Sequence, residues 1–436
     1  MPKNKYTAIK EQILEDIRTG VYPAGKPMAS SNQLAARYMV NRLTVEKALW
    51  EIENEGYISR TQGRCGVVIS KEKKPGIGIL SPSPDISKRF EKVNSLFQNE
   101  TGIEVRMTDV PDYIHAEPQQ VIDMIGSHDL FLAEIYKKDF LFHNNLIRDI
   151  SEFSFFSELI RGNTILAKLL PYMQVYGKVT GLPCFFSPYV LIVNTDLCTK
   201  FGISVPERFR SLDELFLFSK KFDQGSGIRY AGLAVPTSIR RLCYFTLCMN
   251  KFDMASLSDK KKIADALVYL KDAAEKNNAV LGSETVLHNI FSEGRAAMIL
   301  TTYFMLEKYL GKTAFHTDLA GLPAGPDTPN SVMITGLYVT RNADTDAAAQ
   351  YIQFLFSEKM QSHIRETGGG IPVTDSAAFS RVGRNSGLPQ HYTLFKKDLD
   401  HFVELSRYAD DPQWKKIAGR AEMFWQNFDR IENLLD

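Results

Sequence analysis

The side chains with the clearest binding chemistry lie between residues 32 and 64, and most are basic or carry an amide. Arg42, Thr44 and Lys47 lie close together, and Arg60 and Arg64 flank a short polar stretch. Lysine and arginine bind phosphate oxygens, and arginine and asparagine also pair with base edges in the major groove of DNA. The predicted DNA contacts are Asn32, Asn41, Arg42, Thr44, Lys47, Arg60, Gln62, Gly63 and Arg64.

Two short helices and a hairpin are needed to position these side chains. The apolar residues of the segment first recur at helical spacing and then change to a β-rich pattern. The helical positions are Leu34, Ala35 and Tyr38 in the first helix and Val45, Ala48, Leu49 and Ile52 in the second. Tyr57-Ile58 and Val67-Val68-Ile69 then predict a hairpin with a basic tip. Because a helix-turn-helix places its second helix in the major groove, we expect this segment to bind DNA.

A series of short motifs supports this expectation and occurs in a fixed order from residue 6 to residue 70. After a leading helix with Ile9, Ile13 and Ile17, they are Leu34-Ala35, Val40-Asn41-Arg42, Thr44-Val45, Ala48-Leu49, Glu55-Gly56-Tyr57-Ile58 and Gly63-Arg64-Cys65-Gly66. Their order resembles the winged helix-turn-helix of the gluconate-repressor (GntR) family of bacterial regulators, which implies double-stranded operator DNA as a partner. Asn32 and Glu46 stand where that family often has basic residues, so no operator sequence follows from the resemblance. The alternative is a three-helix module that does not contact DNA.

The charge distribution differs between the two parts of the chain. Residues 1–75 carry 13 Lys and Arg against 8 Asp and Glu, whereas the remainder carries 39 against 43. A basic module is what attraction to phosphates requires. Its excess of positive charge is modest, so a single module should bind DNA weakly. We therefore expect a homodimer, in which two recognition helices contact two half-sites.

Composition limits the class of protein and its compartment. The 436 residues suffice for two or three cores, and 44% of them are hydrophobic. No apolar stretch is long enough to cross a bilayer, and the first residues lack the pattern of a secretory signal. The five cysteines form no Cys-x-x-Cys pair, and the histidines show no ligand-like spacing. These observations predict a cytoplasmic protein without a membrane partner or a bound metal.

From residue 77 onward, short apolar strands alternate with helices. Residues 71–76 are polar and predict a linker between a DNA-binding domain at 1–70 and an effector domain at 77–436. The expected strands are Ile77–Leu80, Ile103–Met107 and Asp129–Leu132. The alternation predicts an α/β fold with a mainly parallel sheet, in which ligands bind beyond the carboxyl ends of the strands. Ser81, Glu134 and Tyr136 follow these strands and become candidate ligand contacts.

Four later segments carry the motifs of a second family. They are Phe97–Val105, Tyr176–Pro183 with Leu191–Asn194 and Leu212–Leu215, Phe291–Met298, and Leu322–Pro326 with Ala347–Phe356 and Gly368–Pro372. Together they resemble the carbohydrate type of extracellular solute-binding proteins, which implies two α/β lobes (a periplasmic-binding-protein-like type II fold). Lobe 1 is then expected at about 77–186 and 301–335, and lobe 2 at about 187–300 and 336–436. The chain should cross between lobes near Phe185–Pro188, Ile299–Thr301 and Met333–Tyr338.

The resemblance places a small solute, with a carbohydrate as the first choice, between the lobes. Sugar recognition uses aromatic ring faces and a few polar groups, although any single aromatic is as readily a core residue. The candidate ligand contacts are Ser81, Glu134, Tyr136, Phe185, Phe186, Tyr189, Arg240, Thr302, Tyr303, Phe304, Gly336 and Tyr338. The pair Arg240-Arg241 is equally compatible with a solvated helix face. Ligand binding should favour lobe closure and thereby change the affinity for DNA.

No arrangement of residues predicts catalysis or a cofactor, so the chain is not expected to be an enzyme. Gly368-Gly369-Gly370 lacks the following lysine and the strand and helix of a phosphate-binding loop. A ligand-responsive regulator is the preferred interpretation. One alternative is a GntR-type regulator with an aminotransferase-like domain that binds pyridoxal phosphate, for which Ser258-Asp259-Lys260-Lys261 is the only nearby lysine motif. A transport binding protein is a third, and the missing signal sequence argues against it.

Overall fold

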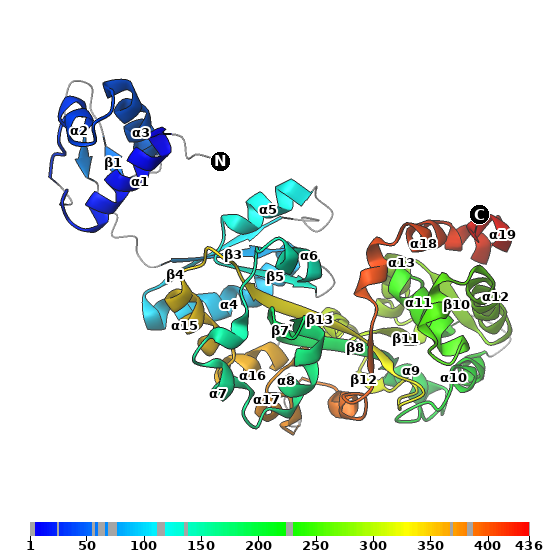
Figure 1. The fold of residues 1–436 in the computed structure, drawn as a ribbon. Coiled ribbons are helices and arrows are strands. Elements are labelled where there is room, and N and C mark those ends of the chain that lie inside the picture. Colours follow the sequence, from blue (N-terminus) through cyan, green and yellow to red (C-terminus); the bar gives the residue numbers. More distant parts are fainter. Residues whose placement is uncertain are drawn as a thin grey trace. The chain divides into compact units, whose positions relative to one another are not determined.

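The computed structural model describes residues 5–23, 26–54, 57–59, 66–68, 76–110, 118–134, 138–223, 230–366, 369–381 and 387–435 (Figure 1). The chain separates into two compact units. One comprises residues 1–76 with 98–104, and the other comprises residues 77–97 with 105–436. The greater part of the predicted linker, residues 71–75, lies outside the described residues.

Three helices and a two-stranded hairpin form the N-terminal unit. They are α1 (Lys5–Arg18), α2 (Ser31–Arg37), α3 (Arg42–Asn54) and the antiparallel strands β1 (Ile58–Ser59) and β2 (Val67–Val68). Their buried core consists of Ile9, Ile13, Tyr22, Met28, Leu34, Val45, Ala48, Leu49, Ile52 and Ile58. Five of the seven predicted inward positions are therefore buried, and the other two, Ala35 and Tyr38, are partly buried against the same core. Ion pairs from α1 to the other helices, Lys10–Glu51 at 3.2 Å and Asp16–Arg37 at 2.9 Å, lie at the edge of this core.

An α/β fold with one long mixed sheet forms the second unit, and the predicted fold class is confirmed (Figure 1). The strand order is β10-β9-β11-β8-β13-β5-β3-β4, with β12 and β14 paired to β8 and β15 paired to β13. The strands are β3 (Gly76–Ser81), β4 (Glu104–Asp109), β5 (Leu130–Glu134), β8 (Leu182–Asn194), β9 (Ala231–Pro236), β10 (Ala279–Gly282), β11 (Ala296–Thr302), β12 (Thr317–Ala320), β13 (Asn330–Val339), β14 (Ile371–Pro372) and β15 (Phe402–Glu404). The expectation of a mainly parallel sheet is wrong, because β8 runs antiparallel to β11 and β13, and β13 also runs antiparallel to β5.

Two lobes share this sheet, and helices cover each of them. The helices of lobe 1 are α4 (Pro84–Thr101), α5 (Pro118–Gly126), α6 (Lys138–His143), α7 (Phe156–Ile160), α8 (Thr164–Leu169), α15 (Thr345–Leu355), α16 (Glu358–Glu366) and α17 (Asp375–Phe379), with the small hairpin β6 (Gln174–Val175) and β7 (Lys178–Val179). Those of lobe 2 are α9 (Thr195–Lys200), α10 (Leu212–Ser219), α11 (Ile239–Met249), α12 (Lys260–Lys276), α13 (Glu284–Ser292), α14 (Leu306–Tyr309), α18 (Pro412–Trp425) and α19 (Ile431–Leu435). One continuous core joins most of the lobe 2 elements, from Tyr189 to Leu434.

Two of the three predicted lobe crossings agree with the strand pairing. The first half of β8 pairs with β13 and its second half with β11 and β12, so β8 passes from lobe 1 to lobe 2. Strand β13 returns to lobe 1, because its last residues pair with β5. The crossing predicted at Ile299–Thr301 is wrong. After β11 the chain turns back, since Tyr309 of α14 packs on Phe291 of α13 and β12 pairs with the lobe 2 half of β8.

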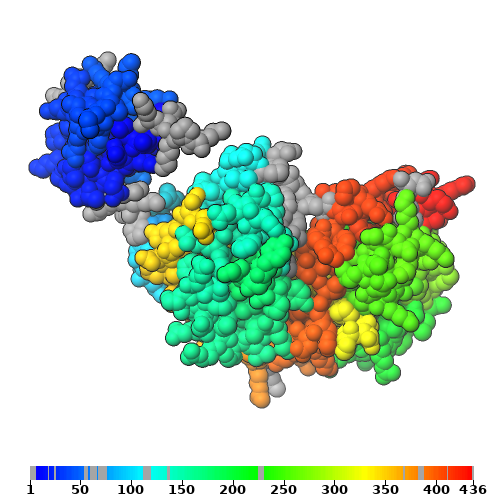
Figure 2. All heavy atoms as spheres, in the orientation of Figure 1, coloured from blue at the N-terminus to red at the C-terminus, as the bar shows by residue number. Residues whose placement is uncertain are grey.

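The predicted lobe boundaries need a matching correction. Most of residues 301–335 belong to lobe 2 through α14 and β12, while the region after Gly336 continues in lobe 1, where Tyr351 of α15 packs on Phe97 of α4 at 5.1 Å. The third crossing is the segment after residue 387, which pairs β15 with the start of β13 and then enters the lobe 2 core at Leu405. In Figure 2 its orange surface lies between the teal surface of lobe 1 and the green surface of lobe 2.

Candidate functional site

The start of α3, the predicted recognition helix, is fixed by side chains predicted to contact DNA. The Asn41 side chain accepts hydrogen bonds from the Thr44 backbone N–H at 2.8 Å and from the Thr44 hydroxyl at 2.7 Å. Helix α2 begins with a capping box, in which Ser30 and Gln33 each bond to the other's backbone. Two defined helix starts hold α2 and α3 in a rigid turn. Asn41 and Thr44 therefore position the helix, whatever else they contact.

The basic residues of α3 are exposed and engaged in contacts that water or phosphate can replace. Arg42 pairs with Glu46 at 3.4 Å one turn later, and the Lys47 ammonium lies 4.0 Å from the centre of the Tyr6 ring. Exposed ion pairs of this kind contribute little to stability, so both cations remain accessible to an anionic partner. Asn32 is exposed on α2. The predicted contacts Arg60, Gln62, Gly63 and Arg64 lie outside the described residues.

Two adjoining cavities in the second unit lie between the lobes. The larger one encloses about 540 Å³, and its polar and aromatic lining is Tyr189, Ser238, Arg240, Arg241, Glu284, Thr302 and Phe304. The smaller one encloses about 230 Å³ and is lined by Pro82, Ser83, Ile86, Arg89, Glu134, Phe304, Met333 and Thr335. Phe304 and Met333 line both cavities. Together they form the interlobe cleft, which has apolar surface and a few polar groups, as small-molecule sites do.

Two ion pairs join the lobes across the interlobe cleft. Glu134 at the end of β5 in lobe 1 accepts a hydrogen bond from Arg240 of α11 in lobe 2 at 2.6 Å. Arg89 of α4 in lobe 1 pairs with Glu307 of α14 in lobe 2 at 3.0 Å. The two pairs have opposite polarity, so each lobe contributes one cation and one anion. Glu404 of β15 is close enough to the first pair to interact with both charges, and burial raises the pKa of its carboxyl.

A third pair lies within lobe 2 on the floor of the larger cavity. The Arg241 guanidinium donates to Glu284 and, at 3.1 Å, to the Ser238 hydroxyl, and it lies 5.4 Å from the centre of the Tyr189 ring. Arg241 is buried, so a solvated helix face is excluded for this residue. Every charged side chain that lines the interlobe cleft in the described chain thus has an opposite charge beside it. A cleft with balanced charges suits an uncharged polar ligand.

Five of the predicted ligand contacts line the interlobe cleft, namely Glu134, Tyr189, Arg240, Thr302 and Phe304. Six others are core or backbone elements, and we correct their assignment: Ser81, Phe185, Phe186, Tyr303, Gly336 and Tyr338. The Ser81 hydroxyl is buried against the Ser83 carbonyl, and Gly336 faces Met173. Tyr136 lies outside the described residues.

The four aromatic corrections have a common cause: each ring is buried against another element of the unit. Phe185 packs on Phe90, and Phe186 packs on Phe395. Tyr303 donates its hydroxyl to the Tyr392 carbonyl at 2.9 Å. Tyr338 stacks on Phe131 with ring centres 4.8 Å apart. Each ring fills the interior of the unit, so its substitution would test stability rather than ligand binding.

Sequence analysis missed Arg89, Ser238, Arg241 and Glu284 as residues that line the interlobe cleft. Arg89 lies on the helix that follows β3, and Ser238 and Glu284 lie at the starts of the helices that follow β9 and β10. Ligand sites in open α/β sheets form at this end of the strands. The same rule that selected Glu134 therefore could have selected these residues once β9 and β10 had been predicted.

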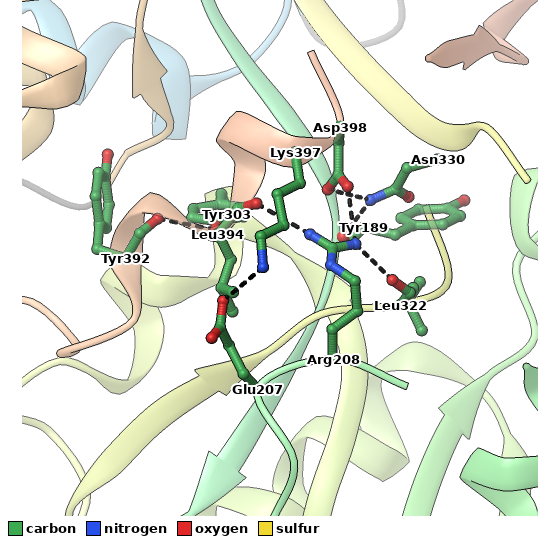
Figure 3. A network of polar contacts seen from close by, with 10 residues as sticks. All are labelled: Tyr189, Glu207, Arg208, Tyr303, Leu322, Asn330, Tyr392, Leu394, Lys397 and Asp398. Atoms are coloured by element: carbon green, nitrogen blue, oxygen red, sulfur yellow. Dashed lines mark hydrogen bonds and ion pairs between the residues drawn. The ribbon is translucent and has the colours of Figure 1, made fainter. Parts of the chain in front are cut away.

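A buried polar network holds the third crossing to lobe 2 (Figure 3). Arg208 pairs with Asp398 at 2.8 Å and donates to the carbonyls of Leu322 and Leu394. Asn330 at the start of β13 donates to Asp398 at 3.0 Å and to the Tyr189 carbonyl at 2.8 Å. Burial raises the pKa of the Asp398 carboxyl, while Arg208 and Asn330 oppose this rise. The network thus joins all three crossings, namely β8 at the cleft residue Tyr189, β13 at Asn330 and the third crossing at Asp398.

With this geometry established, comparison with known proteins identifies both units. Residues 89–385 match the family described as bacterial extracellular solute-binding protein. The chain belongs to that family. Residues 5–68 match the bacterial regulatory proteins of the gntR family, so the N-terminal unit of this solute-binding family member is a GntR-type helix-turn-helix domain. Both resemblances expected from the sequence are confirmed. The aminotransferase-like alternative is wrong, because the second unit has the solute-binding fold and Lys261 lies in the exposed first turn of α12.

Two curated relatives each match less than a quarter of the chain. The uncharacterized HTH-type transcriptional regulator YurK of Bacillus subtilis (strain 168) is 32% identical over 99 residues, which cover 22% of this chain and 36% of that protein. The probable fructoselysine utilization operon transcriptional repressor of Escherichia coli (strain K12) is 34% identical over 68 residues, covering 16% and 28%. The chain thus spans about a third of the length of these curated relatives.

Solved structures match the second unit. Maltose-bound MalE3 of T. maritima superposes with a TM-score of 0.63 at 16% identity, covering 83% of this chain and 97% of that one. At this identity the similarity establishes the fold. No helix in the described part of the chain is long and apolar enough to cross a membrane.

Proposed function

We propose that this protein is a one-component transcriptional regulator that binds operator DNA through residues 1–70 and a carbohydrate in the interlobe cleft. The observation that carries the proposal is the presence, in one chain, of a GntR-type helix-turn-helix and a solute-binding fold. Neither part needs catalysis for this role. A regulator of this kind acts in the cytoplasm, where operator DNA is found.

The composition of the interlobe cleft supports a neutral polyol as ligand. Tyr189 and Phe304 contribute aromatic side chains to the lining, and aromatic rings are common partners for the apolar face of a sugar ring. Glu134, Arg240 and Thr302 offer acceptors and donors for hydroxyl groups. A charged ligand would find no unpaired opposite charge among the described cleft residues, because each charged side chain there already has a partner. Binding of maltose by the T. maritima protein supports the same class of ligand.

Lobe closure provides a route from the ligand to DNA. The ion pairs Glu134–Arg240 and Arg89–Glu307 join the lobes directly, so they stabilise one lobe arrangement. A sugar that contacts both lobes would shift the balance between arrangements in proportion to its differential affinity for them. In a homodimer, this shift would change the spacing or orientation of the two recognition helices and therefore the affinity for a two-half-site operator.

A thermal-shift screen of the full chain against mono- and oligosaccharides tests the sugar assignment. A ligand present at 100 times its dissociation constant should stabilise the protein by about 2.7 kcal/mol. Selection of duplexes from a random DNA pool by the same protein tests the other half. A sugar that stabilises the protein and a recurring DNA sequence are the expected results. A pool without enrichment over the non-specific background would contradict the regulator assignment.

A further inference from the structure

The recognition helix presents an apolar side chain at the end that enters the major groove. Leu43 is the second residue of α3, and 79% of its surface is exposed. It is out of phase with Val45, Ala48 and Leu49, which form the buried face of the same helix. Its exposure therefore does not result from an incompletely packed core. In the helix-turn-helix geometry, residues at this end of the second helix contact base edges.

The polar side chains around Leu43 are already engaged within the protein. Asn41 and Thr44 bond to each other, Arg42 pairs with Glu46, and Lys47 lies over the Tyr6 ring. Arg42 and Lys47 can exchange these contacts for hydrogen bonds to DNA phosphates or base edges. The Leu43 side chain has no donor or acceptor, so it can make no hydrogen bond or ion pair with DNA. Among the groups on base edges in the major groove, the 5-methyl group of thymine is the apolar one.

We propose that Leu43 contacts thymine 5-methyl groups in the major groove and so selects thymine over cytosine at one or two operator positions. The inference rests on the proposed DNA binding and adds the base and the group that are recognised. Leucine favours this contact because each methyl group removed from water adds to the affinity. Lys47, one turn further along α3, would then supply sequence-independent attraction to the phosphates.

Uracil-substituted DNA provides the test, because deoxyuridine differs from thymidine only by the 5-methyl group. Duplexes selected by the full chain from a random pool are remade with uracil at each thymine in turn, and their affinities are measured. For the unmodified protein, loss of the critical methyl should weaken binding about fourfold, the equivalent of about 0.8 kcal/mol. Leu43→Ala should bind the thymine duplex more weakly than the unmodified protein does. Its affinities for the thymine and the uracil duplex should be the same, because the side chain that contacts the methyl group is gone. Leu217→Ala, which removes a leucine of 65% exposure from α10 in the other unit, is the matched control and should behave as the unmodified protein.

The possible results separate this inference from the proposal on which it rests. If selected duplexes bind but no methyl group affects the affinity, the role of Leu43 is overturned while DNA binding stands. The same conclusion holds if Leu43→Ala lowers the affinities for the thymine and uracil duplexes by the same factor, so that the preference for thymine persists. It also holds if the substitution changes only the self-association seen by light scattering. If no duplex is enriched, the proposed function itself fails, and the inference fails with it.

Discussion

The contact between Glu134 and Arg240 is the residue-scale feature on which the effector site depends. At 2.6 Å, with both side chains mostly buried, it is a charge-assisted hydrogen bond between two lobes rather than a solvated surface pair. Both residues line the interlobe cleft. They are therefore placed to contact a ligand and to respond to it.

Glu134→Gln should weaken sugar binding about tenfold, which corresponds to about 1.4 kcal/mol. The reason is that hydrogen bonds to a charged acceptor are roughly twice as strong as neutral ones. Isothermal titration with a sugar from the thermal screen measures the effect. Glu307→Gln is the matched control, because it weakens the other interlobe pair without changing the side chains found to line the cleft. Equal sugar affinity for Glu134→Gln and the unmodified protein would rule out a direct role for Glu134.

On the DNA side, Arg42→Ala should reduce affinity for selected duplexes by about 1–3 kcal/mol if the arginine contacts a guanine. Lys47→Ala should instead lower the slope of log affinity against log salt by roughly one, as expected for a lost phosphate contact. Fluorescence anisotropy at several salt concentrations distinguishes the two effects. Glu46→Gln removes the partner of Arg42 and should not weaken binding. Unchanged affinity of Arg42→Ala at every salt concentration would remove Arg42 from the interface.

Residue types alone could predict part of the site. Glu134 was predicted correctly because ligands in α/β sheets bind beyond the carboxyl ends of the strands, and this residue lies at such an end. The aromatics Phe185 and Phe186 could not be separated from cleft residues, because every residue of β8 is buried and strand alternation carries no information there. Tyr189, on the same strand, lines the interlobe cleft, and only the three-dimensional packing distinguishes it.

Among the elements, the third crossing depends on the buried pair between Arg208 and Asp398 (Figure 3). Asp398→Asn should reduce the free energy of unfolding by about 3–5 kcal/mol, since it leaves the buried guanidinium without a balancing charge. Urea unfolding followed by circular dichroism measures this change. Lys397→Ala breaks the neighbouring exposed pair with Glu207 and should cost less than about 1 kcal/mol. Similar losses in the two variants would contradict the structural role of the network.

The contact between α13 and α14 should make stability depend on pH. His288 is buried and accepts a hydrogen bond from the Tyr309 hydroxyl when neutral, and burial lowers its pKa from 6.5 to about 4. Between these values the unfolded chain binds a proton that the folded chain does not, so stability falls as the pH drops from 6.5 to 4. The loss due to this group should be at most about 3 kcal/mol.

Replacement of the histidine provides the measurement for this pH dependence. The unfolding free energy of His288→Asn should decline less steeply over that interval than that of the unmodified protein, with His143→Asn on the exposed side of α6 as the control. Parallel pH profiles for all three proteins would show that His288 does not titrate as stated.

The crossings illustrate what sequence could not predict at this scale. The crossings at β8 and β13 could be predicted, because the ordered motifs of the solute-binding family indicated where these two long apolar strands pass between the lobes. The resemblance to solute-binding proteins implied another crossing at Ile299–Thr301, near the end of β11, but α14 turns the chain back into lobe 2. The true third crossing contains only a short 3₁₀ helix (Tyr392–Lys397) and the three residues of β15, which have too little periodicity to be detected.

For the whole molecule, the central claim is that one chain couples a sugar to DNA. The two folds were predictable because each carries an ordered series of motifs. Whether they are coupled, and with which sign, is a property of the equilibrium between lobe arrangements in the dimer. Homodimer formation is the accompanying prediction, and light scattering of the protein alone and on DNA tests it. A monomer under both conditions would leave a single, weakly basic module to bind the operator.

The most direct test is the affinity of the full chain for a selected duplex, measured with and without a saturating sugar identified by the thermal screen. We expect a change of about 5- to 150-fold, the range for a coupling free energy of about 1–3 kcal/mol. Reciprocity requires that the duplex change the affinity for the sugar by the same factor. Equal DNA affinities with and without a sugar that demonstrably occupies the cleft would contradict the account, even if each binding activity were present.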